Sequence, residues 1–180
     1  DFLAENIEIV HSDRTVMGNR KEVDIYIPSK SLAIEYNGLY WHSDKFQESS
    51  YHLDKTEDCL SKDIQLVHIF EDEWREKQEI IKSRLLNLIG KSETKIYARN
   101  CEIREVDTKE SLKFLQSNHL QGKLGAKIKL GLYYKEQLVS LMTFGELRKN
   151  LGSDKKEGVF ELLRFCNKLN TNVVGGASRL

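Results

Sequence analysis

Cysteine is scarce in this sequence of 180 residues. The three cysteines, Cys59, Cys101 and Cys166, are odd in number and far apart, and they form no Cys-x-x-Cys motif. This excludes the disulfide framework of a small secreted domain and predicts a cytoplasmic protein in a reducing compartment. A zinc site that combines Cys59 with His52 or His68 is an alternative, although buried side chains that bind no metal are the commoner use of such residues.

Long apolar runs are also missing. No stretch approaches the roughly 20 residues that cross a bilayer, and no signal peptide opens the chain. We therefore expect a soluble protein with no membrane partner. The chain begins at Asp1 and ends at Leu180 within segments that resemble helix interiors, so we expect a fragment of a longer protein.

Net charge is absent as well, because 28 basic residues balance 28 acidic ones. The balance conceals an asymmetry: residues 1–92 hold 12 Lys and Arg against 18 Asp and Glu, and residues 93–180 hold 16 against 10. The sequence predicts an acidic α/β domain over 1–92, followed by a small basic α+β module over 93–180 that suits contact with phosphates. Solvated surfaces without any partner explain the same partition equally well.

The spacing of apolar residues predicts the order of the elements. We expect strands at 7–10, 23–27, 32–36, 64–70, 101–106, 128–134, 138–144 and 160–166, and helices at 48–62, 76–89 and 108–118. The most apolar strand, 64–70, is expected at the centre of its sheet. Thr108 is expected to cap its helix, and residues 91–94 are expected to form a polar linker.

Two carboxylates interrupt the apolar hairpin of residues 23–36. Asp24 and Glu35 lie in strands that otherwise carry apolar side chains, and a carboxylate is costly to bury unless it is paired or holds a metal. Carboxylates on adjacent strands, with a carbonyl and waters, form the hard oxygen site that Mg²⁺ prefers, and Mn²⁺ can replace it. His42 and Asp44 follow in the chain after Gly38, and they supply a titratable base and another hydrogen-bond acceptor. Phosphodiester hydrolysis needs such a cation and such a base.

The pattern Asp-x(10)-Glu-x-Asn, followed by Gly-x-Tyr-Trp-His-x-Asp, resembles the very-short-patch-repair endonuclease branch of the PD-(D/E)XK nucleases. More closely, it is similar to the phage and intron-encoded homing endonucleases of the EDxHD family. The resemblance covers about residues 5–90 and implies a restriction-endonuclease-like mixed sheet flanked by helices, with metal-dependent cleavage of double-stranded DNA. It also implies Asp24 as a metal ligand, His42 as the general base or water-positioning group, and Asp44 as a supporting acid. A homodimer is one arrangement that could cut both strands.

The chain departs from the family pattern at three places. Asn37 replaces the lysine of the common Glu-x-Lys motif, so the charge-stabilising role falls to another residue, with His42 and Lys55 as candidates. Glu35 occupies a position that is not always acidic in the related repair enzymes. The family's first Glu lies on a helix that would fall at or before Asp1.

Further candidates flank the motif. His52, Lys55 and Cys59 follow a helical spacing, which places them along one side of a helix. Lys55 could stabilise charge on a phosphate, or it could lie on a solvated face. Glu22 shares a strand face with Asp24, and an exposed carboxylate is its plainer interpretation.

The second half resembles, weakly, an acetyltransferase-like (GNAT) arrangement, in which a Gly-rich turn such as Gly175-Gly176 binds an anion at a helix N-terminus. We expect no catalysis from it. Its candidate phosphate contacts are Lys123, Lys127, Lys129, Arg148, Lys149, Lys155 and Lys156. The alternative to a nuclease is therefore a nucleic-acid-binding or acyltransferase-like phage protein with a non-catalytic nuclease-like domain.

Overall fold

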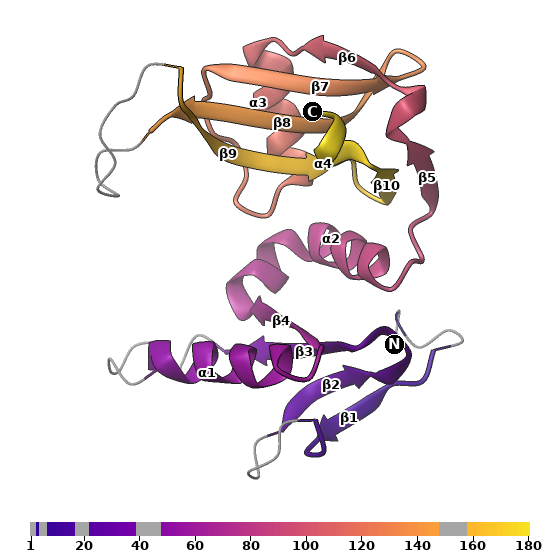
Figure 1. The fold of residues 1–180 in the computed structure, drawn as a ribbon, viewed down its shortest axis with the longest axis vertical. Helices are drawn as coiled ribbons and strands as arrows, with labels where there is room; N and C mark the ends of the chain where they lie inside the picture. Colours follow the sequence, from indigo (N-terminus) through magenta and orange to yellow (C-terminus); the bar gives the residue numbers. More distant parts are fainter. Residues whose placement is uncertain (1–2, 4–6, 17–21, 39–47, 148–157) are drawn as a thin grey trace. The chain divides into compact units, whose positions relative to one another are not determined.

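The computed structural model describes residues 3, 7–16, 22–38, 48–147 and 158–180 (Figure 1). The chain divides into two compact units, residues 1–78 and 79–180. The division falls inside helix α2 (Glu71–Leu88), next to Lys77, whose backbone leaves the helical region (φ −130°, ψ 30°). The division predicted from the change of charge, between residues 92 and 93, stays a prediction.

The fold is mixed α/β, as the sequence predicts. The described residues form four α-helices, a mixed four-stranded sheet, an antiparallel four-stranded sheet and a two-stranded sheet. Within those same ranges, no helix is both long and apolar enough to span a membrane.

The first unit is built on the mixed sheet, with strand order β1-β2-β3-β4. Its strands are β1 (Val10–Asp13), β2 (Val23–Ile27), β3 (Leu32–Asn37) and β4 (Gln65–Phe70). The first three are antiparallel neighbours, and β4 runs parallel to β3. Helix α1 (Glu48–Leu60) supplies the crossover that parallel strands require. The predicted hairpin and the helix predicted at 48–62 are confirmed.

Two expectations for this unit are wrong in detail. The strand expected at 7–10 runs from Val10 to Asp13. The strand expected at the centre of the sheet, β4, is an edge strand among the described residues. Val67 and Ile69 are buried on one face of β4, and Leu66 and Phe70 are half-buried on the other. The apolar run reflects this coverage of both faces, which does not report how many strands pair with β4.

The second unit carries the antiparallel sheet β6-β7-β8-β9 and the parallel pair β10-β5. Its elements after α2 are β5 (Thr94–Tyr97), η3 (Ala98–Asn100), β6 (Glu102–Glu105), α3 (Thr108–Asn118), β7 (Ile128–Tyr134), β8 (Gln137–Glu146), β9 (Phe160–Asn167), β10 (Thr171–Val174) and α4 (Gly176–Arg179). The predicted β7–β8 hairpin is confirmed. Its turn residues, Lys135 and Glu136, both have positive φ, as tight hairpins require.

Two apolar clusters hold the second unit together. One joins Val106, Leu115, Leu138 and Leu141, and the other joins Ile96, Ala98, Cys101, Leu132, Val139 and Val173. The first is tightly packed at Gly131, where a Cβ atom would lie 2.5 Å from Leu138 Cδ1.

Helix α3 is capped by Asp107, whose carboxylate accepts two backbone N–H groups, so the prediction of Thr108 as N-cap is wrong by one residue. The backbone of Asp107 is extended, as an N-cap requires.

Candidate active site

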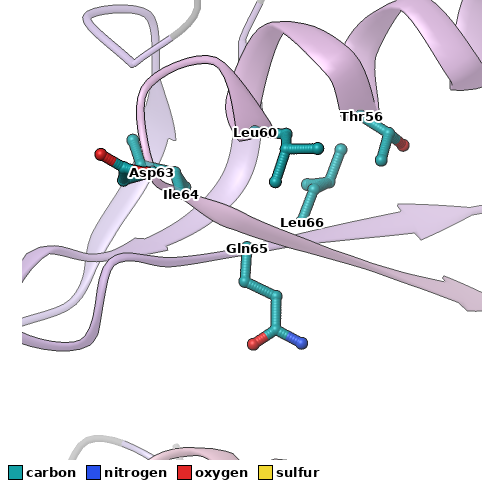
Figure 2. A pocket seen from close by; sticks show the side chains of 6 residues that line it. All are labelled: Thr56, Leu60, Asp63, Ile64, Gln65 and Leu66. Atoms are coloured by element: carbon teal, nitrogen blue, oxygen red, sulfur yellow. The ribbon is translucent and has the colours of Figure 1, made fainter.

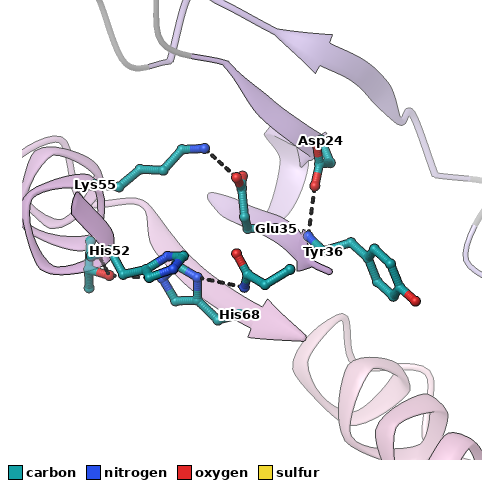
Figure 3. A network of polar contacts seen from close by, with 8 residues as sticks. Asp24, Glu35, Tyr36, His52, Lys55 and His68 are labelled. Atoms are coloured by element: carbon teal, nitrogen blue, oxygen red, sulfur yellow. Dashed lines mark hydrogen bonds and ion pairs between the residues drawn. The ribbon is translucent and has the colours of Figure 1, made fainter. Parts of the chain in front are cut away.

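A buried ion pair joins helix α1 to strand β3. Lys55 and Glu35 reach toward each other (Figure 3), and Nζ lies 2.5 Å from Oε1. The two side chains are only 3% and 13% exposed. Lys55 lies one turn before Cys59, which belongs to an apolar cluster with Val23 and Ala33 of the sheet, so both side chains lie on the helix face toward the sheet. Lys55 is therefore not on a solvated helix face.

Asp24 lies on the strand next to Glu35. Asp24 precedes Ile25, Glu35 follows Ile34, and Ile25 pairs with Ile34 in the antiparallel ladder. The two carboxylates therefore lie across from each other at the end of the β2–β3 ladder. Oδ2 of Asp24 accepts the backbone N–H of Tyr36 at 2.7 Å. This bond fixes the Asp24 side chain to the strand that carries Glu35.

Burial raises the pKa of Glu35 above its usual range, and the negative charge of Asp24 acts in the same direction. The ion pair with Lys55 opposes both effects without cancelling them. The second oxygen of Glu35, Oε2, is buried and has no hydrogen-bond partner in the part of the chain that the structure describes. A buried carboxylate oxygen without a partner, beside another carboxylate, is a position where a cation or a proton would be stabilised.

A chain of hydrogen bonds runs beside the ion pair. The Thr56 hydroxyl donates its one proton to the carbonyl of His52 (2.8 Å), so it must accept from Nε2 of His68 (3.1 Å). His68 then accepts the amide N–H of Asn37 at Nδ1 (3.2 Å). Burial lowers the pKa of His68, and His52 and Lys55 act in the same direction, which agrees with a neutral ring. The chain links α1, β4 and β3 around the strand pair that holds Glu35.

The structure gathers Asp24, Glu35 and Lys55, and it places Asn37 and His52 in the adjacent hydrogen-bond chain. Glu22 is not with them. It accepts from Nε of Arg14 at 3.0 Å, and both side chains are exposed. His42 and Asp44 lie outside the described residues.

Two residues of the hydrogen-bond chain, Thr56 and His68, were not predicted as part of this site. His68 carries the same signal as Glu35, because it is a polar residue between buried apolar neighbours of a strand. The register confirms the relation, since His68 is the direct β4 partner of Glu35. The sequence carries no such signal for Thr56, because many threonines on helices form no hydrogen bond to another element.

The residues present fit Mg²⁺ or Mn²⁺ better than zinc. Cys59 is fully buried, and burial raises the pKa of its thiol, which disfavours the thiolate that zinc needs. No group of three His, Cys, Asp or Glu side chains is placed to hold a metal in the described ranges. Two carboxylates suffice for Mg²⁺, which keeps several of its waters.

A pocket among the described residues of this unit lies elsewhere. It has a volume of about 320 Å³ and lies between the end of α1 and the start of β4 (Figure 2). Its lining is Thr56, Leu60, Asp63, Ile64, Gln65 and Leu66. It contains neither carboxylate of the site, so we assign it no role in catalysis.

The predicted phosphate contacts of the second unit are only partly described. Lys127 pairs with Glu146 at 3.2 Å, and Lys129 donates to the carbonyl of Ala126 at 3.4 Å. Lys123 is exposed. The other candidates, Arg148, Lys149, Lys155 and Lys156, lie outside the described residues.

Comparison of the chain with protein families, with curated proteins and with solved structures finds no match. Function is therefore inferred from the geometry around Asp24, Glu35 and Lys55.

Proposed function

We propose that this chain is a divalent-metal-dependent endonuclease that hydrolyses double-stranded DNA, with Asp24, Glu35 and Lys55 at its catalytic centre. The observation that carries the proposal is the buried Lys55–Glu35 pair, 2.5 Å long, with a second carboxylate on the adjacent strand. A hairpin joined by a crossover helix to a parallel strand is also the core expected of a restriction-endonuclease-like fold. The resemblance to the EDxHD homing endonucleases and to the very-short-patch-repair enzymes supports the same assignment.

Asp24 and Glu35 would hold the cation through their oxygen atoms. Its position is supported by the buried Oε2 of Glu35 and by the fixed orientation of the Asp24 carboxylate. When bound, a divalent cation polarises the phosphoryl oxygens and lowers the pKa of a coordinated water.

Lys55 would supply positive charge where the phosphate gains negative charge as water attacks. An ammonium in a water-poor site stabilises that charge more strongly than it would in bulk water. This role is the one that the motif lysine holds in related nucleases, and here Asn37 occupies the motif position. Asn37 is held by His68, so it would act as a neutral positioning group.

Hydrolysis also requires proton transfers. A base must take a proton from the attacking water, and the oxygen of the broken P–O bond must receive one. His42 remains the candidate for the first step, with Asp44 as a supporting acid, on the resemblance alone. A homodimer would allow cleavage of both strands.

The test is nicking of supercoiled plasmid DNA with Mg²⁺, with Mn²⁺ and with EDTA. We expect Asp24→Asn and Lys55→Met to lower the rate by about 10²-fold or more, since each removes an electrostatic contribution to the transition state. Asp54→Asn and Lys30→Met, which change exposed side chains, are the matched controls. Undiminished cleavage by either site variant would remove that residue from the mechanism.

A second measurement guards against misfolding of the Lys55 variant. The double variant Glu35→Gln/Lys55→Met removes both charges and should fold while remaining inactive. Calorimetric titration with Mn²⁺ should show a site in the wild-type chain that is weakened in Asp24→Asn. Equal Mn²⁺ binding by both proteins would contradict the assignment of Asp24.

A DNA-binding or acyltransferase-like protein without nuclease activity is the second candidate. It is favoured by the ammonium of Lys55 being engaged by Glu35 and by the absence of a lysine at position 37. Metal-independent DNA binding together with no nicking under any metal condition would support it.

A further inference from the structure

The outer face of the small β5–β10 sheet in the second unit carries an aromatic residue that contacts two cations. Ile96 and Val173 point inward and are buried, and their neighbours Lys95 and Tyr97 are exposed. Tyr97 is 41% exposed, and Val174 lies beside it in register on β10. Arg99, in η3, is exposed as well.

Both cations lie against the same ring. Nζ of Lys95 is 5.6 Å from the centroid of Tyr97, and Cζ of Arg99 is 4.9 Å from it. Attraction to the ring holds each cation within about 6 Å of the centroid. Two positive charges are thereby held beside one exposed ring, where both could contact phosphates of one strand.

No carboxylate neutralises these cations in the described residues. The nearest acids along the chain are engaged elsewhere. Glu93 accepts the amide of Asn170 at 2.9 Å, and Glu102 accepts from Arg104 at 2.6 Å.

The same unit contains a neutralised counterpart. The guanidinium of Arg104 also lies 4.9 Å from a tyrosine ring, that of Tyr133, yet it is paired with both Glu102 and Glu136. Packing of a cation on an aromatic ring therefore does not by itself require unpaired charge. The excess positive charge at Tyr97 needs another explanation.

We propose that Lys95, Tyr97 and Arg99 form a contact for the DNA phosphate backbone, with Tyr97 as the residue that positions the two cations. The inference rests on the proposed nuclease function only for the identity of the partner. These residues are distinct from Lys123, Lys127 and Lys129, the predicted contacts that the structure describes.

The test is fluorescence anisotropy of the full chain with a short labelled DNA duplex in EDTA, over a range of KCl concentrations. Each neutralised phosphate contributes about 0.9 to the slope of log K against log salt. The double variant Lys95→Gln/Arg99→Gln should weaken binding severalfold and reduce that slope by about 2. Tyr97→Leu should weaken binding to a smaller degree, and Tyr97→Phe should not.

The matched control is Lys135→Gln/Arg104→Gln. It also removes one lysine charge and one arginine charge, from cations that lie over other tyrosine rings. It should leave the slope close to that of the wild-type chain. Equal losses in the two double variants, or no binding of duplex DNA by the wild-type chain, would overturn the proposal. Binding that depends on Lys95 and Arg99 without any nicking would instead refute the nuclease and leave this contact standing.

Discussion

The Lys55–Glu35 pair of the first unit and the Arg104 pairs of the second differ in burial. In the first, Lys55 and Glu35 are withdrawn from solvent, and one carboxylate oxygen has no partner among the described residues. In the second, Arg104 pairs with two glutamates whose side chains are 63% and 81% exposed. Burial of an ion pair costs several kcal/mol per ion, and apolar replacements are often no less stable. Stability alone therefore gives no reason to keep the pair of the first unit, whereas the proposed catalytic role would give one.

The largest effect should come from breaking that pair on one side. Lys55→Met leaves the Glu35 carboxylate buried without its counter-charge, and we expect a loss of about 3–5 kcal/mol in the stability of the first unit. Glu35→Gln/Lys55→Met should recover most of the loss. Hydrogen exchange of β3 and β4 amides measures the effect in this unit alone.

Arg104→Gln is the corresponding change in the second unit. Its partners are solvated, so exchange of the β6 and β7 amides should hardly change. A loss as large as that of Lys55→Met would abolish the contrast between the buried pair and the exposed one.

In the second unit, disturbing the packing of the apolar core should cost more stability than removing an exposed ion pair. A Cβ atom at Gly131 would lie 2.5 Å from Leu138 Cδ1 and 2.6 Å from Val106 Cγ2. Gly131→Ala is therefore expected to cost about 1–3 kcal/mol in the free energy of unfolding. Gly125→Ala is the control, because a Cβ there meets nothing within 4 Å. Equal thermal stability of the two variants would show that the cluster around Gly131 relaxes freely.

A smaller effect should follow from the cap of helix α3. Asp107→Ala removes the acceptor for the N–H groups of Lys109 and Glu110, at an expected cost of about 1 kcal/mol. Thr108→Ala should cost less, because the N-cap is the preceding residue. Thermal unfolding of both variants compares them, and a larger loss for Thr108→Ala would restore the sequence-based choice of cap.

The elements that the sequence predicts well are those with local signals. The hairpin of β2 and β3 follows from two apolar runs around Pro28, and the β7–β8 hairpin follows from its short polar turn. Strand β5 has no such signal, because only Ile96 of its four residues is buried and its partner β10 lies far along the chain. Parallel pairing of distant segments leaves no periodic pattern in either one. The sequence likewise carries no local signal for the departure from helical geometry at Lys77.

The residues of the candidate site also divide into those with a local sequence signal and those without one. Asp24 and Glu35 could be found because carboxylates in apolar strands are conspicuous, and Lys55 could be placed on one side of its helix by spacing. Which side faced the sheet could not be known, because Lys55 is as compatible with solvent as with a buried partner. The link from Thr56 through His68 to Asn37 depends on the register of β3 against β4, which no local pattern encodes.

The smallest expected effect is a difference in pH dependence between two histidines. Burial lowers the pKa of His68 in the first unit and of His119 in the second, each with nearby positive groups acting in the same direction. The ordinary pKa of histidine, which applies in the unfolded chain, is about 6.5. A histidine whose pKa is lowered by folding contributes its full stabilisation at a pH above that value. This contribution is lost as the pH falls from there through the lowered pKa of the folded state. His68→Gln should flatten the acid-side loss of stability in the first unit only, and His119→Gln in the second only.

Nuclear magnetic resonance of ¹⁵N-labelled imidazoles would test the tautomer directly. In the first unit the proton of His68 should be on Nε2, because Nδ1 accepts from Asn37 at 3.2 Å. Protonation of Nδ1 would turn an acceptor into a donor and force the Asn37 amide to reverse. A His68 that titrates above 6.5, or that carries its proton on Nδ1 at neutral pH, would break the link between α1 and β3. Nothing in the hydrogen-bond chain would then distinguish His68 from a buried histidine without a role in the site.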